Sequence, residues 1–366
     1  MPLGAYKNKY SMKIKDFNIG EQSPVFIIAE LSANHNGSLE TAIETIRAAK
    51  RAGADAIKLQ TYTADTMTID CDKADFRLSQ GTIWDGRTFY DLYKEAFTPW
   101  EWHQQLFDEA DKEGLICFSS PFDSTSVDLL ESLNTPVYKI ASFEITDIPL
   151  IELVASKMKP VIISTGIANE DDIELALAAC RRMGNNDIAL LKCTSSYPAP
   201  LDEANLIMIK ELAKRYGVIA GLSDHTIGSI APIVATCLGA KIIEKHFILD
   251  RSIGGPDSSF SMNEIEFTEM VRSVRDAERA IGKIDFNLTE KQQKGRDFSR
   301  SLYVVNDIKQ GELLTKENIK AIRPGYGLHP RFYNEIIGCI ATTDMKFGDR
   351  FTMKDYERLK DVEGAN

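Results

Sequence analysis

The sequence predicts an α/β protein in which a (β/α)8 TIM barrel is followed by a small, mostly β domain. Short apolar runs rich in β-branched residues recur eight times in the first three quarters of the chain. These runs are continuous, as in parallel strands that are buried on both faces. Amphipathic helical segments separate them, and this alternation stops before the last quarter of the chain. Together these features favour a barrel over other α/β folds.

The eight predicted strands cover 26–32, 56–62, 116–122, 137–142, 161–166, 188–196, 218–225 and 242–247. Helix-end signals lie between them. A helical pattern from Leu39 ends at Gly53, and one from Glu170 begins with acids and ends with arginines before Gly184. An open doubly wound sheet is the alternative. No GxGxxG motif follows the first run, which weighs against a nucleotide-binding version of that sheet.

One interval is longer than the others. Between the second and third predicted strands, about thirty-five residues precede a helix that begins near Thr98. This insert contains GTIWDG at 81–86. Loops of such length in a compact domain are usually lids or binding loops, so we expect one here. The alternative is a surface excursion with a small core of its own.

The composition changes after the last predicted barrel helix, which runs from Asn263 to Gly282. We expect a barrel domain over 17–282, a polar linker over 283–297 and a small β domain over 298–360. About sixty residues are marginal for a free-standing fold, so the small domain is expected to dock on a partner surface.

The overall composition excludes some classes of partner. A net charge of −11 argues against nucleic acid and anionic membranes, although a local pocket can still bind a small anion. The sequence has no stretch of 18 apolar residues, so it predicts no membrane-spanning helix. The first 24 residues lack the apolar core of a signal peptide and are expected to form a plain extension of a cytoplasmic protein. The six cysteines lack CxxC spacing and predict neither disulfides nor a zinc site.

Polar side chains stand at the ends of all eight runs. They are Glu30, Lys58, Ser119, Ser120, Lys139, Ser142, Ser164, Thr165, Thr194 to Ser196, Ser223, His225 and His246. Taken singly, each has an ordinary structural explanation, such as a core histidine or a hydroxyl bonded to nearby backbone. Because the carboxyl ends of barrel strands form one rim, their joint occurrence predicts an active site there.

The residue types suggest the chemistry. Two lysines with a ring of hydroxyls suit a small dianion such as phosphate. His225 and His246, on neighbouring strands, would ligate one divalent metal and leave positions for water and substrate. Without cysteine or a third histidine this is a poor zinc site, and hydrated Mn²⁺ or Mg²⁺ fits better. Glu30 would bind sugar hydroxyls or move a proton. We expect metal-assisted carbon–carbon bond formation or cleavage on a phosphorylated substrate.

The chain also contains, in order, AELSANHNGS, AIKLQTY, FSSPFD, YKIASFE, ISTG, GLSDHT, IEKHF and GGPDS, then SRSL, DIKQGE and IRPG. From Phe17 onward these motifs resemble the sialic-acid synthase family. The resemblance implies a (β/α)8 barrel joined to a C-terminal antifreeze-like (SAF) domain. It also implies the condensation of phosphoenolpyruvate with an amino-sugar to give a nine-carbon acid.

The same resemblance implies roles for individual residues. His225 and His246 would bind the metal, with Mn²⁺ preferred and Mg²⁺ or Co²⁺ as alternatives, while Glu30 and Asp257 would contact the sugar and metal-bound water. The phosphoenolpyruvate site would comprise Lys58, Ser120, Lys139, Ser142, Ser164, Ser195 and Ser223. Arg323 and Phe298 of the small domain would reach the sugar site of the partner subunit in a domain-swapped homodimer.

Two features depart from the neuraminate branch of that family. Ser195 in CTSSYP stands where that branch typically has Asn, and DSSFSM from Asp257 to Met262 stands where it typically reads DH. With GTIWDG at 81–86, they resemble the pseudaminic acid synthase branch, whose acceptor is 2,4-diacetamido-2,4,6-trideoxy-L-altrose. N-acetylneuraminate or legionaminic acid synthesis, a Schiff-base aldolase and a non-catalytic amino-sugar-binding protein remain alternatives.

Overall fold

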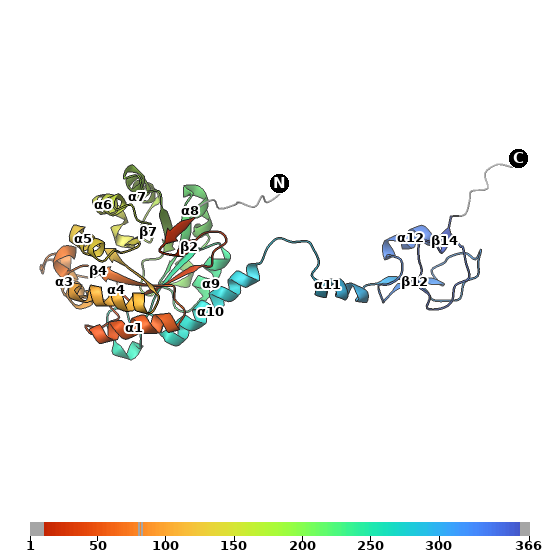
Figure 1. Ribbon diagram of the computed structural model, residues 1–366, viewed down its shortest axis with the longest axis horizontal. Helices are drawn as coiled ribbons and strands as arrows, with labels where there is room; N and C mark the ends of the chain where they lie inside the picture. Colours follow the sequence, from red (N-terminus) through yellow and green to blue (C-terminus); the bar gives the residue numbers. More distant parts are fainter. Residues whose placement is uncertain (1–10, 80, 82, 359–366) are drawn as a thin grey trace. The chain divides into compact units, whose positions relative to one another are not determined.

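The computed structural model describes residues 11–79, 81 and 83–358. The chain forms two compact units, Met1–Gly282 and Lys283–Asn366, and each is described here by itself. In the first unit a ring of helices surrounds the strands (Figure 1).

The first unit is built on a closed barrel of eight parallel strands in the order β10-β3-β4-β5-β6-β7-β8-β9. The strands are β3 (Phe26–Glu30), β4 (Ala56–Thr61), β5 (Ile116–Pro121), β6 (Tyr138–Ile140), β7 (Val161–Ser164), β8 (Ile188–Cys193), β9 (Ile219–Asp224) and β10 (Ile242–His246). β10 closes the barrel against β3, with Ile242 opposite Phe26 and His246 opposite Glu30. The predicted barrel is confirmed, and each predicted run contains one strand.

Helices cover the outside of the barrel because each strand is apolar on both faces. They are α1 (Leu39–Arg51), α4 (His103–Lys112), α5 (Ser124–Ser132), α6 (Ile148–Ser156), α7 (Glu170–Arg182), α8 (Met208–Tyr216), α9 (Ile230–Cys237) and α10 (Glu264–Ile281). The end signals behave as expected. Asn169 caps α7 through the Asp172 amide, and acids in the first turn and arginines in the last complement the helix dipole.

A β-hairpin that was not predicted from the sequence precedes the barrel. β1 (Met12–Ile14) pairs with β2 (Phe17–Ile19) in antiparallel fashion. Met12, Ile14 and Ile19 are buried in a cluster with side chains from the first half of several barrel strands. The expectation of an irregular extension over the first 24 residues is therefore wrong for 12–19, and its first ten residues lie outside the described part of the chain. Its apolar alternation spans only three residues per strand, which is too short to stand out as a periodic signal.

The described part of the long insert between β4 and α4 is partly packed on itself, and residues 80 and 82 lie outside the described residues. It holds α2 (Ala64–Met67), α3 (Phe89–Ala96) and the short 3-10 helices η1 (Ala74–Phe76) and η2 (Trp100–Trp102). Leu78 and Leu92 are buried within it, and Tyr93 packs on Tyr62 with ring centroids 5.7 Å apart. The insert thus has the small core that we considered as the alternative to a lid.

The second unit is small and mostly β, as predicted. Its strands are β11 (Ser301–Val304), β12 (Ile319–Ile322), β13 (Ile340–Ala341) and β14 (Tyr356–Glu357), which pair as two antiparallel ribbons. A 3-10 helix η7 (Pro330–Phe332) and α12 (Tyr333–Ile336) connect them. Leu302, Ile308 and Phe351 belong to its core. The stretch expected as a linker contains α11 (Glu290–Gly295), which Thr289 caps, followed by the 3-10 helix η6 (Arg296–Phe298).

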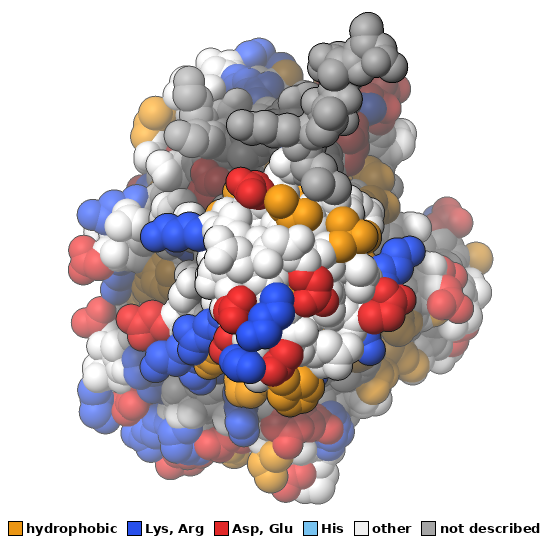
Figure 2. Space-filling view, turned by 90° about the vertical axis from the view of Figure 1, so that its right-hand side faces the viewer, with side chains coloured by type: hydrophobic (Ala, Val, Ile, Leu, Met, Phe, Trp, Pro, Cys, Tyr) orange, Lys and Arg blue, Asp and Glu red, His pale blue; other side chains and the backbone are white. Residues whose placement is uncertain are grey.

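Acidic and basic side chains are interspersed on the face shown in Figure 2, and hydrophobic side chains form only small groups there. Within the described part of the chain, no helix has the length and apolar character needed to cross a membrane.

Candidate active site

The polar residues predicted from the strand ends meet at one mouth of the barrel. Glu30, Ser164 and His246 are the last residues of β3, β7 and β10, and His225 directly follows β9. Ten of the eleven predicted barrel-site residues are buried, namely Glu30, Lys58, Ser120, Lys139, Ser142, Ser164, Ser223, His225, His246 and Asp257, and Ser195 is partly buried. Burial of so many polar groups at the carboxyl ends of the strands marks this mouth as the candidate active site.

Two lysines form the centre of the site. The Lys58 ammonium lies 2.8 Å from Glu30 Oε2 and 3.5 Å from Glu244 Oε1. The same Glu244 oxygen lies 3.5 Å from the Lys139 ammonium and accepts a hydrogen bond of 3.2 Å from Ser223 Oγ. The Glu244 carboxylate therefore contacts Lys58, Lys139 and Ser223, three residues that we predicted to bind phosphoenolpyruvate.

Burial shifts the acid–base properties of this cluster. It raises the pKa of Glu30 from its usual 4.5 to about 7, although the charge of Lys58 opposes the shift. Burial alone would also raise the pKa of Glu244, but the Lys139 and Lys58 ammonium groups outweigh it and lower that pKa. Burial lowers the pKa of Lys139. With Glu30 protonated, two ammonium groups face one carboxylate, and the net positive charge suits a small anion.

A ring of hydroxyls lies beside the lysines. Ser195 Oγ donates to Ser142 Oγ over 2.8 Å, and Ser142 Oγ accepts from the backbone amide of Ile167 over 3.1 Å. A Cβ atom on Gly166 would lie 2.2 Å from Ser195 Oγ and 2.6 Å from Ser142 Oγ, so glycine is needed for this approach. The buried Ser164 hydroxyl has no hydrogen-bond partner among the described residues, which leaves it available to a ligand.

The two histidines face each other across neighbouring strands. Their ring centroids are 5.3 Å apart at an interplanar angle of 59°. His225 Nδ1 lies 2.9 Å from the carbonyl oxygen of Thr194, which can only accept, so Nδ1 carries a hydrogen and Nε2 is the ring nitrogen left to ligate a metal when the ring is neutral. His246 Nδ1 is buried without a hydrogen-bond partner among the described residues and lies 3.7 Å from Asp257 Oδ2.

This pair fits a divalent cation. Burial lowers the pKa of His246 well below its usual value, and a neutral imidazole is the form that ligates a metal. The described residues contain no cluster of three or more His, Cys, Asp or Glu side chains arranged for a metal. A cation held here would therefore complete its coordination with water and substrate oxygens, as Mn²⁺ and Mg²⁺ commonly do.

Aromatic side chains pack against the imidazole rings of His225 and His246. The Tyr197 ring lies 4.4 Å from that of His225, and the Phe260 ring lies 5.0 Å from that of His246. Trp84 of the long insert packs on Tyr197 at 5.5 Å and donates from Nε1 to the carbonyl oxygen of Pro256 over 3.2 Å. The insert thus reaches the site as a binding loop would, in addition to having its own core.

Glu244, Gln60, Tyr197 and Glu144 belong to the site but were not singled out from the sequence. Gln60 Nε2 donates to Glu30 Oε1 over 2.9 Å, and Glu144 Oε2 is buried without a hydrogen-bond partner among the described residues. Strand alternation offered a signal for Glu244, because it lies two residues before His246 and so on the same face.

Three other predicted residues need separate mention. Asp257 accepts a hydrogen bond of 2.5 Å from Ser32 Oγ, and burial raises its pKa. Phe298 and Arg323 belong to the second unit, where Phe298 ends η6 and Arg323 follows β12, and both are exposed within it.

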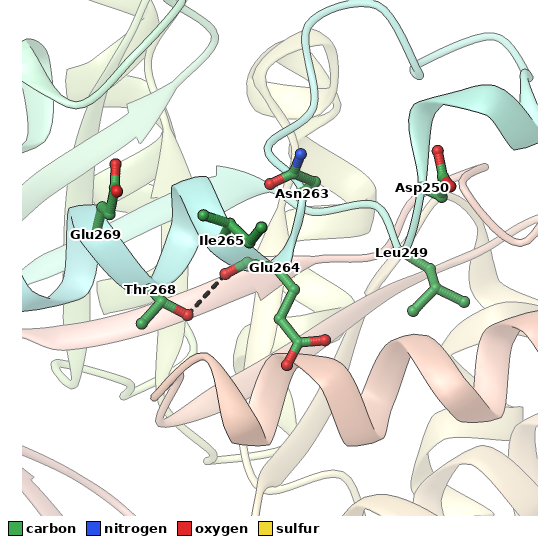
Figure 3. Close-up of a pocket in the computed structure, with 7 residues that line it drawn as sticks. All are labelled: Leu249, Asp250, Asn263, Glu264, Ile265, Thr268 and Glu269. Atoms are coloured by element: carbon green, nitrogen blue, oxygen red, sulfur yellow. Dashed lines mark hydrogen bonds between the residues drawn. The ribbon is translucent and has the colours of Figure 1, made fainter.

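A surface hollow lies elsewhere, along the start of α10 (Figure 3). It has a volume of about 650 Å³ and is lined by Leu249, Asp250, Asn263, Glu264, Ile265, Thr268 and Glu269. None of the predicted strand-end residues lines it, so we assign it no part in the chemistry.

The closed barrel and the buried polar residues at its strand ends define a (β/α)8-barrel enzyme. Comparison with known proteins narrows this class. The NeuB family description matches residues 45–285, and the SAF domain description matches residues 299–357. The chain belongs to the NeuB family, which confirms the resemblance to sialic-acid synthases.

Three relatives show how close the similarity is. The pseudaminic acid synthase of Campylobacter jejuni is 49% identical over 346 residues, which cover 94% of this chain and 100% of the relative. The pseudaminic acid synthase of Helicobacter pylori is 50% identical over 92% of this chain and 98% of the relative. The crystal structure of an N-acetylneuraminic acid synthetase from Leptospira borgpetersenii matches with a TM-score of 0.70 and 30% identity, covering 78% of this chain and 95% of that one.

Proposed function

We propose that this chain is a pseudaminic acid synthase, which condenses phosphoenolpyruvate with 2,4-diacetamido-2,4,6-trideoxy-L-altrose and releases phosphate. The observation that carries the proposal is the identity of about half of all residues to two pseudaminic acid synthases over more than nine tenths of the chain. The site agrees with it, because the barrel mouth combines a cationic cluster with an imidazole pair.

Phosphoenolpyruvate is held by the lysine cluster and the hydroxyls around it. Lys58 and Lys139 pair with its phosphate and carboxylate, and they stabilise the charge that develops on phosphate as it leaves. Hydroxyl donors complete the anion site, and they are supplied by Ser120, Ser142, Ser164, Ser195 and Ser223.

The acceptor sugar lies between this cluster and the imidazoles. Glu30 and Asp257 bind its hydroxyls and the water that takes part in the reaction. His225 and His246 would hold a divalent cation, Mn²⁺ in preference to Mg²⁺ or Co²⁺, which would supply Lewis-acid polarisation of the aldehyde of the open-chain sugar.

In the reaction, a carbon–carbon bond forms first and a carbon–oxygen bond of phosphoenolpyruvate then breaks. Carbon 3 of phosphoenolpyruvate forms a bond to the aldehyde carbon, and positive charge develops at carbon 2. Water adds at carbon 2, and the bond between carbon 2 and the bridging oxygen breaks, so that this oxygen leaves with phosphate. Lys58 and Lys139 remain close to the phosphate oxygens throughout.

The choice of acceptor depends on the wall around the imidazoles. Trp84 and Phe260 make this wall apolar, which suits a sugar that lacks a hydroxyl at carbon 6 and carries two acetamido groups. Ser195 replaces a longer amide side chain at the same mouth. Discrimination against N-acetylmannosamine follows from the unpaired hydroxyl that this sugar would bring to an apolar surface.

The remaining parts of the proposal concern assembly. The barrel domain over 17–282, the linker over 283–297 and the SAF domain over 298–360 form one subunit of a cytoplasmic homodimer. Each SAF domain covers the barrel of the partner, where Arg323 and Phe298 complete the sugar site. The partners are small molecules and a second copy of the chain, not nucleic acid or a membrane.

A phosphate-release assay with a panel of acceptors tests the function. With phosphoenolpyruvate present, phosphate should appear with the diacetamido altrose and much more slowly with N-acetylmannosamine or the legionaminic acid precursor. Faster turnover of either of those sugars would reassign the branch. Binding of a sugar without phosphate release would instead support the non-catalytic alternative. Borohydride trapping of a substrate on a lysine would support an aldolase.

A further inference from the structure

We infer that the buried ion pair between Asp224 and Lys245 positions the two imidazoles for a divalent cation. The two residues touch neither substrate nor metal, and they act through the histidines that follow them in sequence. This inference rests on the proposed role of His225 and His246.

The pair lies directly behind the two histidines. Asp224 of β9 and Lys245 of β10 are opposite each other in the parallel register. Asp224 Oδ2 lies 2.5 Å from Lys245 Nζ, and each side chain is only 1% exposed. Because successive side chains of a strand point to opposite faces, the neighbouring His225 and His246 both point into the barrel mouth.

Lys245 also fixes the loop that carries His225. His225 lies one residue beyond the end of β9, where its carbonyl oxygen still accepts a hydrogen bond of 2.9 Å from the Ala199 amide. Lys245 Nζ donates to the carbonyl oxygens of Thr226 and, over 3.3 Å, Gly228. Asp224 Oδ1 accepts from the amide of Thr226 over 2.9 Å. Lys245, which precedes His246, therefore contacts both neighbours of His225, namely Asp224 and Thr226.

Loss of one partner should loosen this arrangement. The remaining charge would be buried without compensation, so the strand ends and the loop would shift to admit water. A divalent cation needs its nitrogen ligands at a fixed separation, and changes in the groups that orient ligands commonly weaken metal affinity by about 10–100-fold. A purely structural ion pair would lower the stability of the fold without this loss of metal affinity.

The test is a titration of chelator-treated full-length protein with Mn²⁺ alone, in which free Mn²⁺ is followed by electron paramagnetic resonance. Asp224→Asn should bind Mn²⁺ about 10–100-fold more weakly than the wild type. Thermal unfolding without metal, measured on the same samples, reports stability separately. Asp55→Asn is the matched control. It breaks a pair with Arg275 of 3.0 Å just before β4, at the opposite end of the barrel, and should lower stability while leaving Mn²⁺ affinity unchanged.

A folded Asp224→Asn protein with wild-type Mn²⁺ affinity would overturn the inference. If Asp224→Asn does not fold, Lys245→Arg keeps the charge but changes the donor geometry, and it should also weaken Mn²⁺ binding. Wild-type affinity in that variant would equally refute the positioning role. A wild-type protein that does not bind Mn²⁺ would instead refute the proposed metal role, and this inference with it.

Discussion

The proposed anion site depends on the missing side chain of Gly166. The hydroxyls of Ser142 and Ser195 occupy the space that a Cβ would need, and Cys193 Sγ lies only 3.0 Å from that position. Gly166→Ala should therefore push the hydroxyls apart and raise the KM for phosphoenolpyruvate by about tenfold or more. Steady-state kinetics at saturating acceptor would measure this change.

Gly295→Ala provides the control for this prediction. A Cβ on Gly295, at the end of α11, has no neighbouring atom within 4 Å in the described structure. Its kinetic constants should equal those of the wild type. If Gly166→Ala also keeps the wild-type KM, the hydroxyls of Ser142 and Ser195 are not part of the anion site.

Glu144 should make the stability of the protein depend on pH. Burial raises its pKa from 4.5 to about 7, so the folded state holds a proton that the unfolded state releases. The free energy of unfolding should fall as the pH rises from about 4.5 to about 7, because the unfolded state binds fewer protons there. Glu144→Gln removes this loss and should be more stable than the wild type at pH 8 by ~1–3 kcal/mol.

Urea denaturation at pH 4.5 and pH 8 would measure the difference. At the lower pH the two proteins should be nearly equal in stability, because Glu144 is then protonated in the folded state. The exposed Glu101 provides the control, since Glu101→Gln should change stability equally little at both values. A stability difference between Glu144→Gln and wild type that does not grow with pH would contradict the prediction.

The strand-end residues could be predicted from the sequence because the carboxyl ends of all the strands lie at one rim of a barrel. Gln60 lies inside β4, where a polar residue has no signal of its own until its contact with Glu30 is known. For Glu244 the alternation of β10 indicates only the face that it shares with His246, and not its contact with Lys58. Tyr197 reaches the imidazoles from the irregular segment after β8. The path of such a segment depends on tertiary packing, which local patterns do not encode.

At the scale of elements, the hairpin of β1 and β2 should contribute to stability. Ile14 is fully buried among barrel side chains, whereas Lys13 on the same strand is exposed. Ile14→Ala should lower the free energy of unfolding by about 2–4 kcal/mol, from lost apolar burial and the cavity left behind. Lys13→Ala should have almost no effect, and equal effects of the two changes in urea denaturation would show that the hairpin is not packed.

The strands differ in how clearly they can be predicted from the sequence. The barrel strands are four to six residues long in most cases, and flanking helix caps such as Asn169 mark their spacing. β1 and β2 have three residues each, and their burial results from the barrel surface that they cover. Short strands stabilised by distant contacts are therefore visible only once the barrel is in place.

At the scale of the whole molecule, the proposed domain-swapped dimer predicts complementation between variants. His246→Ala damages the barrel site, and Arg323→Ala damages the SAF contribution to it. After subunit exchange, half of the dimers are mixed, and each mixed dimer has one intact site and one doubly damaged site. About a quarter of wild-type activity should return.

Two mixtures decide the outcome. Each variant mixed with itself is the control, and it should show no gain in phosphate release. If each SAF domain served its own barrel, every site would keep one defect, and the mixture of the two variants would be no more active than the separate proteins. That result would remove the cross-subunit role of Arg323.

The pair of strands that closes the barrel links the two proposed metal ligands to the order in which the chain is synthesised. His246 ends β10 and lies opposite Glu30 of β3, a residue made more than two hundred positions earlier on the ribosome. Before β10 emerges, β3 has an unpaired edge, and His225 has no second imidazole beside it. The capacity to bind the cation therefore appears only when the barrel closes, so metal uptake during translation would report the moment at which a nascent chain completes its fold.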